Sequence, residues 1–256
     1  MSSQTAIVRI SGISKNFGGL AALQEVSITV GRGTITSVIG PNGAGKTTLI
    51  NVLSGFLKPD SGTIELNGAV ITGRKAHAIT RLGMARTFQT AQVFGQMSVL
   101  ENVMVGCHAR TRTGLAGAAL RLPGVRAEER AVREKARGLL AMVGLAGQAS
   151  MTAASIPIGS QRLLEIARAL ASQPAVLLLD EPAAGLNTQE TRRLGELLLD
   201  IRRQGITIML VEHDMELVMD ISDEIAVLNF GRSIARGTPA EIQASPDVIA
   251  VYLGED

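Results

Sequence analysis

The chain has 256 residues, of which 46% are hydrophobic, and this is enough for a sizeable core in one large domain or two lobes. The formal net charge of +2 is too small to indicate nucleic-acid binding by itself, and no apolar run approaches the roughly 20 residues that a membrane-spanning helix needs. The single cysteine, Cys107, excludes an internal disulfide and suits a reducing compartment, and residues 1–5 lack the pattern of a secretory signal.

The hydrophobic pattern differs between segments of the chain. Residues 5–35 and 62–72 alternate between apolar and polar side chains, which predicts an antiparallel sheet. Residues 36–60 and 165–235 alternate strand-like with helix-like segments, as expected of a parallel sheet with crossover helices. We therefore expect a single α/β domain over residues 1–256, with the sheets in about 5–89 and 161–235, a helical lobe in about 90–160 and a short helical tail in 236–256.

The most informative stretch is a glycine loop between a strand and a helix. Residues 35–39 indicate a buried strand, residues 48–53 indicate a helix, and the loop between them matches G-x-x-x-x-G-K-[ST]. Such a loop places backbone N–H groups around a phosphate chain, and its glycines let the backbone approach the anion. A plain glycine turn is the alternative, which the flanking elements disfavour. The predicted nucleotide-binding residues are Gly40, Pro41, Asn42, Gly43, Ala44, Gly45, Lys46, Thr47 and Thr48.

Two carboxylates end another apolar strand. Residues 175–179 are continuously apolar, which is typical of a strand buried on both faces, and Asp180 and Glu181 follow them. Ligands of open α/β sheets bind at this carboxyl edge. We therefore predict that Asp180 and the Thr47 hydroxyl hold Mg²⁺, that Glu181 orients and deprotonates a water, and that Lys46 faces the β- and γ-phosphates. Two solvated acids are the alternative, which the phosphate loop disfavours.

With these motifs in place, the chain resembles the ATP-binding subunits of ABC transporters over nearly its whole length. Phe17 lies where that family stacks an aromatic ring on adenine, and a core phenylalanine is the alternative. Gln89, in Arg-Thr-Phe-Gln, matches the Q-loop glutamine, which implies a catalytic role and an oxygen for Mg²⁺. His213, after the apolar strand 206–211, matches the switch histidine near the γ-phosphate, and residues 185–187 match the D-loop. The resemblance implies a P-loop NTPase fold with a RecA-like parallel-sheet core, an N-terminal antiparallel β lobe and a helical lobe.

Within this family, the chain is similar to the first ATP-binding subunit of the branched-chain amino-acid importers. The similarity rests on residues 86–89, 182–187 and 211–215, on the ending Tyr-Leu-Gly-Glu at 252–255 and on the long segment after Gln89. The ATPase of lipopolysaccharide export shares that ending, but it differs around the Q-loop and carries a full signature motif.

The signature motif departs from the family's Leu-Ser-Gly-Gly-Gln. Residues 156–160 are Ile-Pro-Ile-Gly-Ser, so Gly159 keeps its place while Pro157 replaces the serine that touches the γ-phosphate and Ile158 replaces the first glycine. A hydroxyl bonded to a charged phosphate contributes roughly 1.5–3 kcal/mol. We therefore expect Gly159 and Ser160 to form a weakened clamp on the nucleotide of a second subunit.

Charge gathers between the Q-loop and the signature. Residues 110–137 hold eight Lys or Arg and three Glu, and residues 127–142 predict a helix with Glu129 and Arg133 four residues apart. A solvated helix face is the favoured interpretation. Contact with a permease loop or with anionic lipid headgroups is the alternative.

The resemblance implies that the chain binds ATP and Mg²⁺ and hydrolyses ATP as one of a pair of ATP-binding subunits, a heterodimer or, alternatively, a homodimer. The pair would work on two transmembrane permease subunits, peripherally at the cytoplasmic face of the inner membrane, with an extracytoplasmic solute-binding protein as an indirect partner and no nucleic acid. The expected cargo is branched-chain amino acids. The alternatives are another ABC system, such as lipopolysaccharide export, and a soluble ABC ATPase acting on ribosomes or DNA, which the single phosphate loop and the lack of heptads disfavour.

Overall fold

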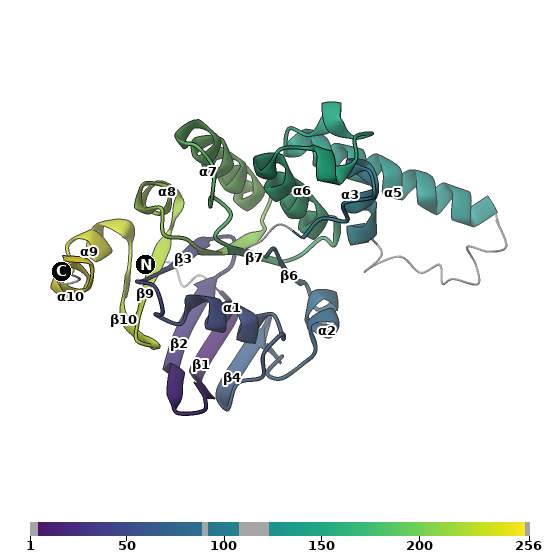
Figure 1. Ribbon diagram of the computed structural model, residues 1–256. Helices are drawn as coiled ribbons and strands as arrows, with labels where there is room; N and C mark the ends of the chain where they lie inside the picture. Colours follow the sequence, from purple (N-terminus) through teal and green to yellow (C-terminus); the bar gives the residue numbers. More distant parts are fainter. Residues whose placement is uncertain (1–4, 89–91, 108–122, 254–256) are drawn as a thin grey trace. The chain divides into compact units, whose positions relative to one another are not determined.

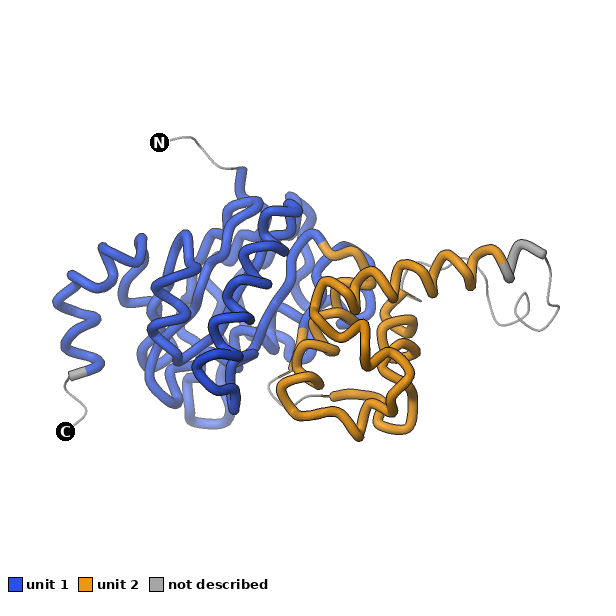
Figure 2. Tube along the Cα trace, turned by 90° about the horizontal axis from the view of Figure 1, so that it is seen from above, with its two compact units in different colours: residues 1–86, 175–256 blue, residues 87–174 orange. Residues whose placement is uncertain are grey.

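The computed structural model describes residues 5–88, 92–107 and 123–253. The chain folds as two compact units, one made of Met1–Arg86 and Ala175–Asp256 and the other of Thr87–Pro174 (Figure 2). The expected boundary near residue 160 therefore differs from the one in the structure. Helix α6 (Ile158–Ala171) belongs to the second unit because it packs on two other helices of that unit.

The first unit holds two sheets (Figure 1). A four-stranded antiparallel sheet has the order β2-β1-β4-β5, and a six-stranded sheet has the order β10-β9-β3-β8-β7-β6. The second sheet is parallel except for β10, which pairs antiparallel with β9 and makes the sheet mixed. The strands are β1 (Ala6–Phe17), β2 (Leu20–Gly31), β3 (Ile35–Ile39), β4 (Ser61–Leu66), β5 (Ala69–Val70), β6 (Met84–Arg86), β7 (Val176–Asp180), β8 (Thr207–Val211), β9 (Glu224–Asn229) and β10 (Arg232–Gly237).

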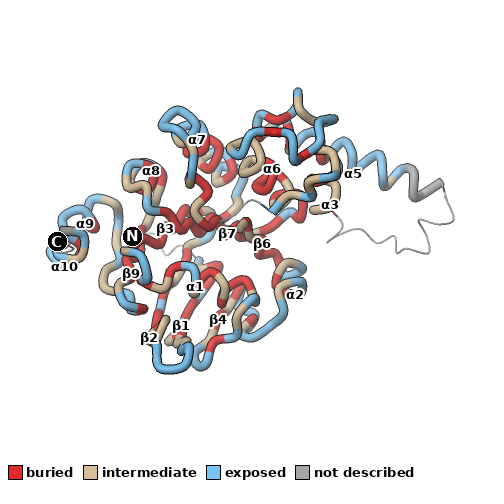
Figure 3. Tube along the Cα trace, viewed as in Figure 1, coloured by how far each residue is buried: buried red, intermediate tan, exposed pale blue. Residues whose placement is uncertain are grey.

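Six helices complete the described part of this unit: α1 (Lys46–Leu53), α2 (Ala76–Arg81), α7 (Thr188–Arg203), α8 (Met215–Ile221), α9 (Pro239–Gln243) and α10 (Pro246–Leu253). Helix α1 joins the two sheets, because its Leu49 and Ile50 share one buried cluster with apolar side chains from both. A second cluster packs α8, α9 and α10 on β3 and β9. The strands β3, β7 and β8 of the six-stranded sheet are buried along their whole length, as Figure 3 shows for β3 and β7, so they form the core of the unit.

The helix and strands predicted around the phosphate loop, the two acids and His213 agree with the structure to within two residues at their ends, whereas the helix expected at 127–142 begins four residues earlier, at Pro123. The helix expected at 48–53 starts at Lys46, inside the glycine-loop motif. The strands expected at 175–179 and 206–211 are β7 and β8. The C-terminal tail becomes helical only from Pro239, because β10 continues to Gly237.

The second unit is helical where it is described. It contains α3 (Val99–Cys107), α5 (Pro123–Met142), α6 and two short 3-10 turns, Ala146–Gln148 and Ala153–Ser155. Exposed ion pairs lie along α5, including the expected Arg133–Glu129 pair at 3.4 Å. Residues 110–122 of the basic stretch lie outside the described residues.

A search for membrane spans found no helix in the described ranges with the length and apolar character to cross a bilayer.

Candidate nucleotide site

The phosphate loop connects β3 to α1, and backbone contacts hold it at both ends. A Cβ at Gly40 would lie 2.1 Å from the carbonyl oxygen of Leu228, and a Cβ at Gly45 would lie 2.5 Å from that of Ala22. Both glycines have positive φ, 150° and 101°, which side chains disfavour. The backbone of the loop therefore packs directly on the backbones of β9 and β2. Of its middle residues, Asn42 and Gly43 are exposed to solvent.

Lys46 is buried at the start of α1, with its charge inside the loop. Its Nζ donates to the carbonyl oxygens of Gly40 at 2.6 Å and Pro41 at 2.9 Å. Burial lowers the pKa of Lys46, while the negative charges of Glu181 and Asp180 oppose that shift. The ammonium group thus contacts the loop backbone, and the charges of both predicted acids act on it.

Asp180 ends β7 in a buried position, and its two carboxylate oxygens differ. Oδ2 accepts a hydrogen bond from Arg86 at 2.9 Å. Oδ1 is buried and has no hydrogen-bond partner among the described residues. Burial raises the pKa of Asp180, and Arg86 opposes the shift. An unpartnered buried carboxylate oxygen fits a hard cation such as Mg²⁺, and the exposed Thr47 on α1 carries a hydroxyl of the same ligand class.

Glu181 follows Asp180 with a strained backbone. Its φ of 47° is unusual for a residue with a Cβ, and its N–H donates to the carbonyl of Val211 at 2.8 Å. The bond to the end of β8 holds the residue in this conformation. A carboxylate oxygen of Glu181 lies 3.9 Å from Nδ1 of His213, whose side chain is 64% exposed. The ends of β7 and β8 therefore bring together the predicted base and the predicted switch histidine.

Glu212 is a buried acid that the sequence analysis did not single out. Its Oε1 accepts from the N–H of Ala183 at 2.6 Å and its Oε2 from the N–H of His213 at 3.1 Å. Burial raises the pKa of Glu212, and these backbone hydrogen bonds oppose the shift. Glu212 thus ties the turn after Glu181 to the residue that carries the switch imidazole. An acid directly after an apolar strand, as at Asp180, was the signal that could have revealed it.

Phe17 ends β1 with its ring 49% exposed. The Nζ of Lys15 lies 5.8 Å from the ring centroid, and the same Nζ is paired with Asp60 at 2.6 Å. The side chain is therefore not part of the core and is accessible to a ligand, with the Lys15 ammonium beside it.

The remaining predicted residues lie elsewhere in the chain. Gln89 falls outside the described residues. Gly159 and Ser160 belong to the second unit, in the first turn of α6, where Pro157 is the N-cap and Ile158 is 68% exposed. Among the described residues, no side chain caps this helix start.

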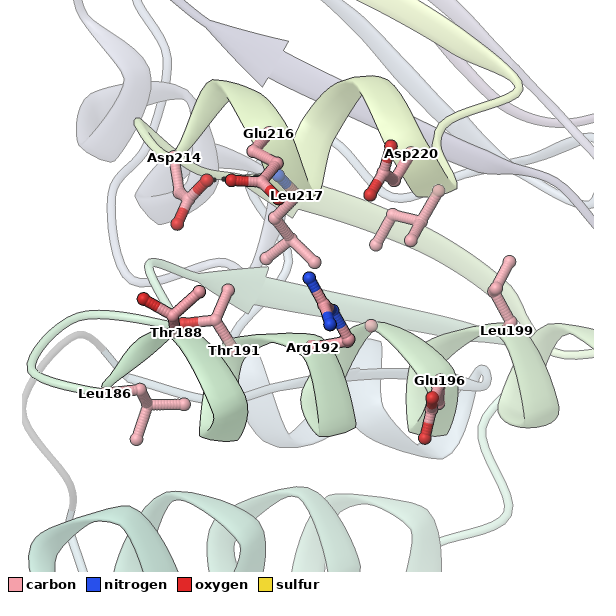
Figure 4. A pocket seen from close by; sticks show the side chains of 12 residues that line it. Leu186, Thr188, Thr191, Arg192, Glu196, Leu199, Asp214, Glu216, Leu217 and Asp220 are labelled. Atoms are coloured by element: carbon pink, nitrogen blue, oxygen red, sulfur yellow. Dashed lines mark hydrogen bonds between the residues drawn. The ribbon is translucent and has the colours of Figure 1, made fainter.

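A pocket of about 250 Å³ lies between α7 and α8, lined at one end by Leu186 and Asp214 (Figure 4). Figure 4 shows Arg192 of α7 pointing toward α8, on which Asp220 also lines the pocket. None of its lining residues comes from the phosphate loop or from β7. This hollow is therefore distinct from the candidate nucleotide site.

Comparison with known families gives two matches. The model of the family described as ABC transporter matches residues 23–184. A second model, described as Branched-chain amino acid ATP-binding cassette transporter, matches residues 232–256.

Many curated relatives and solved structures are similar to the chain, and two of each illustrate the match. The high-affinity branched-chain amino acid transport ATP-binding protein LivG of Salmonella typhimurium is 46% identical, and BraF of Pseudomonas aeruginosa, of the same description, is 44% identical; each match covers 97% of this chain and 98% of the relative. A nucleotide-free ATP-binding cassette from an ABC transporter has a TM-score of 0.85 at 34% identity, with 98% of this chain and 100% of that chain covered. The ADP conformation of MJ1267, an ATP-binding cassette of an ABC transporter, has a TM-score of 0.84 at 33% identity, with the same coverage. The chain therefore belongs to the ABC transporter family, as an ATP-binding cassette and an ATPase.

Proposed function

We propose that the chain hydrolyses MgATP to drive the import of branched-chain amino acids, as one of two ATP-binding subunits on a permease pair. The chemical part rests on one observation: β3, β7 and β8 bring Lys46, Asp180, Glu181 and His213 to one edge of the sheet. The cargo is inferred from the relatives named for branched-chain amino-acid transport and from the matching C-terminal segment.

The nucleotide would be held by stacking, backbone donors and charge. Phe17 offers its exposed ring to adenine, and the loop from Gly40 to Thr48 offers backbone N–H groups to the phosphates. Lys46 would turn its charge to the β- and γ-phosphates. Asp180, through Oδ1, with Thr47 and Gln89, would hold Mg²⁺. When bound, Mg²⁺ neutralises charge on the phosphates.

Hydrolysis needs a water, a base and a group that positions both. Glu181 would accept a proton from the water while the water oxygen bonds to the γ-phosphorus and the bond to the β-phosphate oxygen breaks. His213, at 3.9 Å from Glu181, would hold the γ-phosphate in line, and Gln89 would orient the water. The bond from Glu212 to the His213 N–H would keep the histidine backbone in register with the turn after Glu181.

The second subunit would complete each site. Gly159 and Ser160 would meet the nucleotide bound by the partner, through the N–H groups at the start of α6. The heterodimer is the favoured form, with a homodimer as the alternative. The assembly would lie peripherally at the cytoplasmic face of the inner membrane, served indirectly by an extracytoplasmic solute-binding protein.

The test is co-purification followed by reconstitution. The chain is expressed with candidate permease subunits from the same organism, and the complex that co-purifies is placed in vesicles with ATP inside. We expect uptake of leucine or valine, dependent on the solute-binding protein and lost with Glu181→Gln. A complex that hydrolyses ATP but moves none of these amino acids would contradict the cargo, and export of lipopolysaccharide would establish the alternative.

A further inference from the structure

Arg86 is a buried arginine behind the candidate metal carboxylate. It ends β6, which lies parallel to β7 in the six-stranded sheet. Its side chain is 8% exposed and that of Asp180 is 0% exposed. A buried guanidinium that keeps its charge needs hydrogen-bond partners on each edge of its plane, so the identity of those partners shows what the residue holds.

The two ends of the guanidinium contact different elements. Nη2 donates to Oδ2 of Asp180 at 2.9 Å. Nη1 donates to Oδ1 of Asn51 at 2.7 Å and to Oγ of Ser54 at 2.9 Å. Both acceptors lie on or at the end of α1, the helix that begins with Lys46. The ring of Phe56 lies 5.6 Å from the guanidinium carbon. Arg86 therefore links the phosphate-loop helix to the end of β7.

This link fixes which way the carboxylate faces. A carboxylate bonded at neither oxygen can turn about its terminal torsion, which has a broad profile. The bond from Arg86 to Oδ2 restricts that rotation, and Oδ1 is left buried without a hydrogen-bond partner in the described part of the chain. Asn51 and Ser54, on and at the end of α1, hold Arg86 by hydrogen bonds. The orientation of the Asp180 carboxylate therefore depends on the position of α1.

We propose that Arg86 is a positioning residue for the metal: it fixes the Asp180 carboxylate so that Oδ1 faces the cation, without contacting cation or nucleotide itself. The proposal rests on the assignment of Asp180 as an Mg²⁺ ligand. Partners that orient metal ligands in this way typically contribute about 10–100-fold to metal affinity. The opposite possibility is that Arg86 competes with the cation for Asp180, and the two predict effects of opposite sign.

The experiment measures binding, not turnover. The affinity for a fluorescent, non-hydrolysable ATP analogue is titrated with excess EDTA and again with saturating Mg²⁺, and the ratio of the two is the metal coupling. Mn²⁺ binding in the presence of the analogue, followed by electron paramagnetic resonance, gives the metal affinity directly. Arg86→Lys keeps the charge but not the planar fork. We expect its metal coupling and Mn²⁺ affinity to fall about tenfold or more, while its affinity in EDTA stays within about twofold.

Three further variants make the outcome decisive. Arg202→Lys is the matched control, because Arg202 pairs with Asp223 at 2.8 Å on the same unit, and it should leave the coupling unchanged. Asn51→Ala removes one anchor of Arg86 without unpairing a charge and should lower the coupling a few-fold, so it carries the test if Arg86→Lys fails to fold. Asp180→Asn tests the underlying assignment: an unchanged coupling there would remove Asp180 as a ligand and the proposed function with it.

Unchanged or increased coupling in Arg86→Lys, with Asp180→Asn defective, would overturn the positioning role alone. An increase would identify Arg86 as a competitor of the metal. A loss as large in Arg202→Lys would assign the effect to general destabilisation and would also overturn the proposal.

Discussion

The N-termini of helices α1 and α6 carry the two motifs that are predicted to contact phosphate, and these N-termini differ in structure. At α1, glycines press the loop against the backbones of β2 and β9, and Lys46 bonds to the loop from inside. At α6, Pro157 precedes the helix, Ile158 is 68% exposed, and the Gln161 side chain donates to the Ile156 carbonyl. Contacts within the first unit therefore fix the N-terminus of α1. The N-terminus of α6 instead presents an apolar side chain and backbone N–H groups.

This difference has a functional meaning under the proposed mechanism. The charged groups around α1 are paired within the first unit, so the site can be pre-organised before a partner arrives. The start of α6 would acquire its ligand only when a second subunit brings a nucleotide. Substitutions at the first motif should therefore act in the isolated chain, and substitutions at the second only in the assembled dimer.

The largest effect is expected from Glu181→Gln. Loss of a positioned base costs about 10²–10⁴-fold in turnover, and the amide keeps the shape of the side chain. ATP hydrolysis by the assembled complex measures this loss. ATP affinity should be retained, and an assembled variant that turns over at close to the wild-type rate would remove Glu181 from the role of base.

Lys46→Ala should act on binding in the isolated chain. A hydrogen bond to a charged group contributes about 1.5–3 kcal/mol, so ATP affinity should fall roughly 10- to 150-fold. Equilibrium titration measures the affinity, and thermal unfolding checks that the fold is kept. Lys58→Ala, at an exposed lysine of the same unit, is the control and should bind as the wild type does. Unchanged ATP affinity in Lys46→Ala would contradict the phosphate-loop assignment.

The relative activity of the two nucleotide sites can be tested in the proposed heteromeric complex. In the proposed heterodimer, the site with Lys46, Glu181 and His213 would use the partner's signature, whereas the opposite site would use residues 156–160 of this chain. If the partner's signature is complete, disabling Glu181 should abolish more activity than disabling the matching glutamate of the partner. Steady-state ATPase rates of the two single knockouts measure the difference. A larger loss from the partner's knockout would show that Pro157 and Ile158 leave the signature competent, and equal losses would show that the altered signature does not matter.

Sequence patterns located the backbone of the site but not its supporting side chains. The apolar runs predicted β3, β7 and β8 because burial on both faces leaves a continuous signal. The roles of Arg86 and Glu212 could not be predicted in this way. Arg86 bonds to Asp180, 94 residues away in the chain, and Glu212 bonds to Ala183, 29 residues away. No local period encodes such pairs, which arise only when the sheet orders its strands.

The same reasoning explains the boundary at α6. The position of α6 after the signature motif predicts that this helix belongs with the sheets of residues 161–235. Its contacts with α3 and α5 put it in the second unit instead. The signature motif therefore predicts a function for the start of α6, but it does not predict the helices on which α6 packs.

The smallest effect concerns the pH dependence of the unfolding free energy through Glu212. This buried acid accepts hydrogen bonds from the backbone N–H groups of Ala183 and His213. Burial raises its pKa above the ordinary value of 4.5. The folded chain therefore retains a proton that the unfolded chain releases, so rising pH favours unfolding from about pH 4.5 up to the folded pKa. Glu212→Gln mimics the protonated acid and removes this term. We expect the unfolding free energy of the variant, relative to wild type, to increase as pH rises from about 4.5 and to level off above the folded pKa, as measured by urea unfolding at several pH values. Glu216→Gln, at an exposed acid of α8, should follow the wild-type curve. A difference between Glu212→Gln and wild type that does not vary with pH would mean that hydrogen bonds from Ala183 and His213 fully offset the cost of burying the charge.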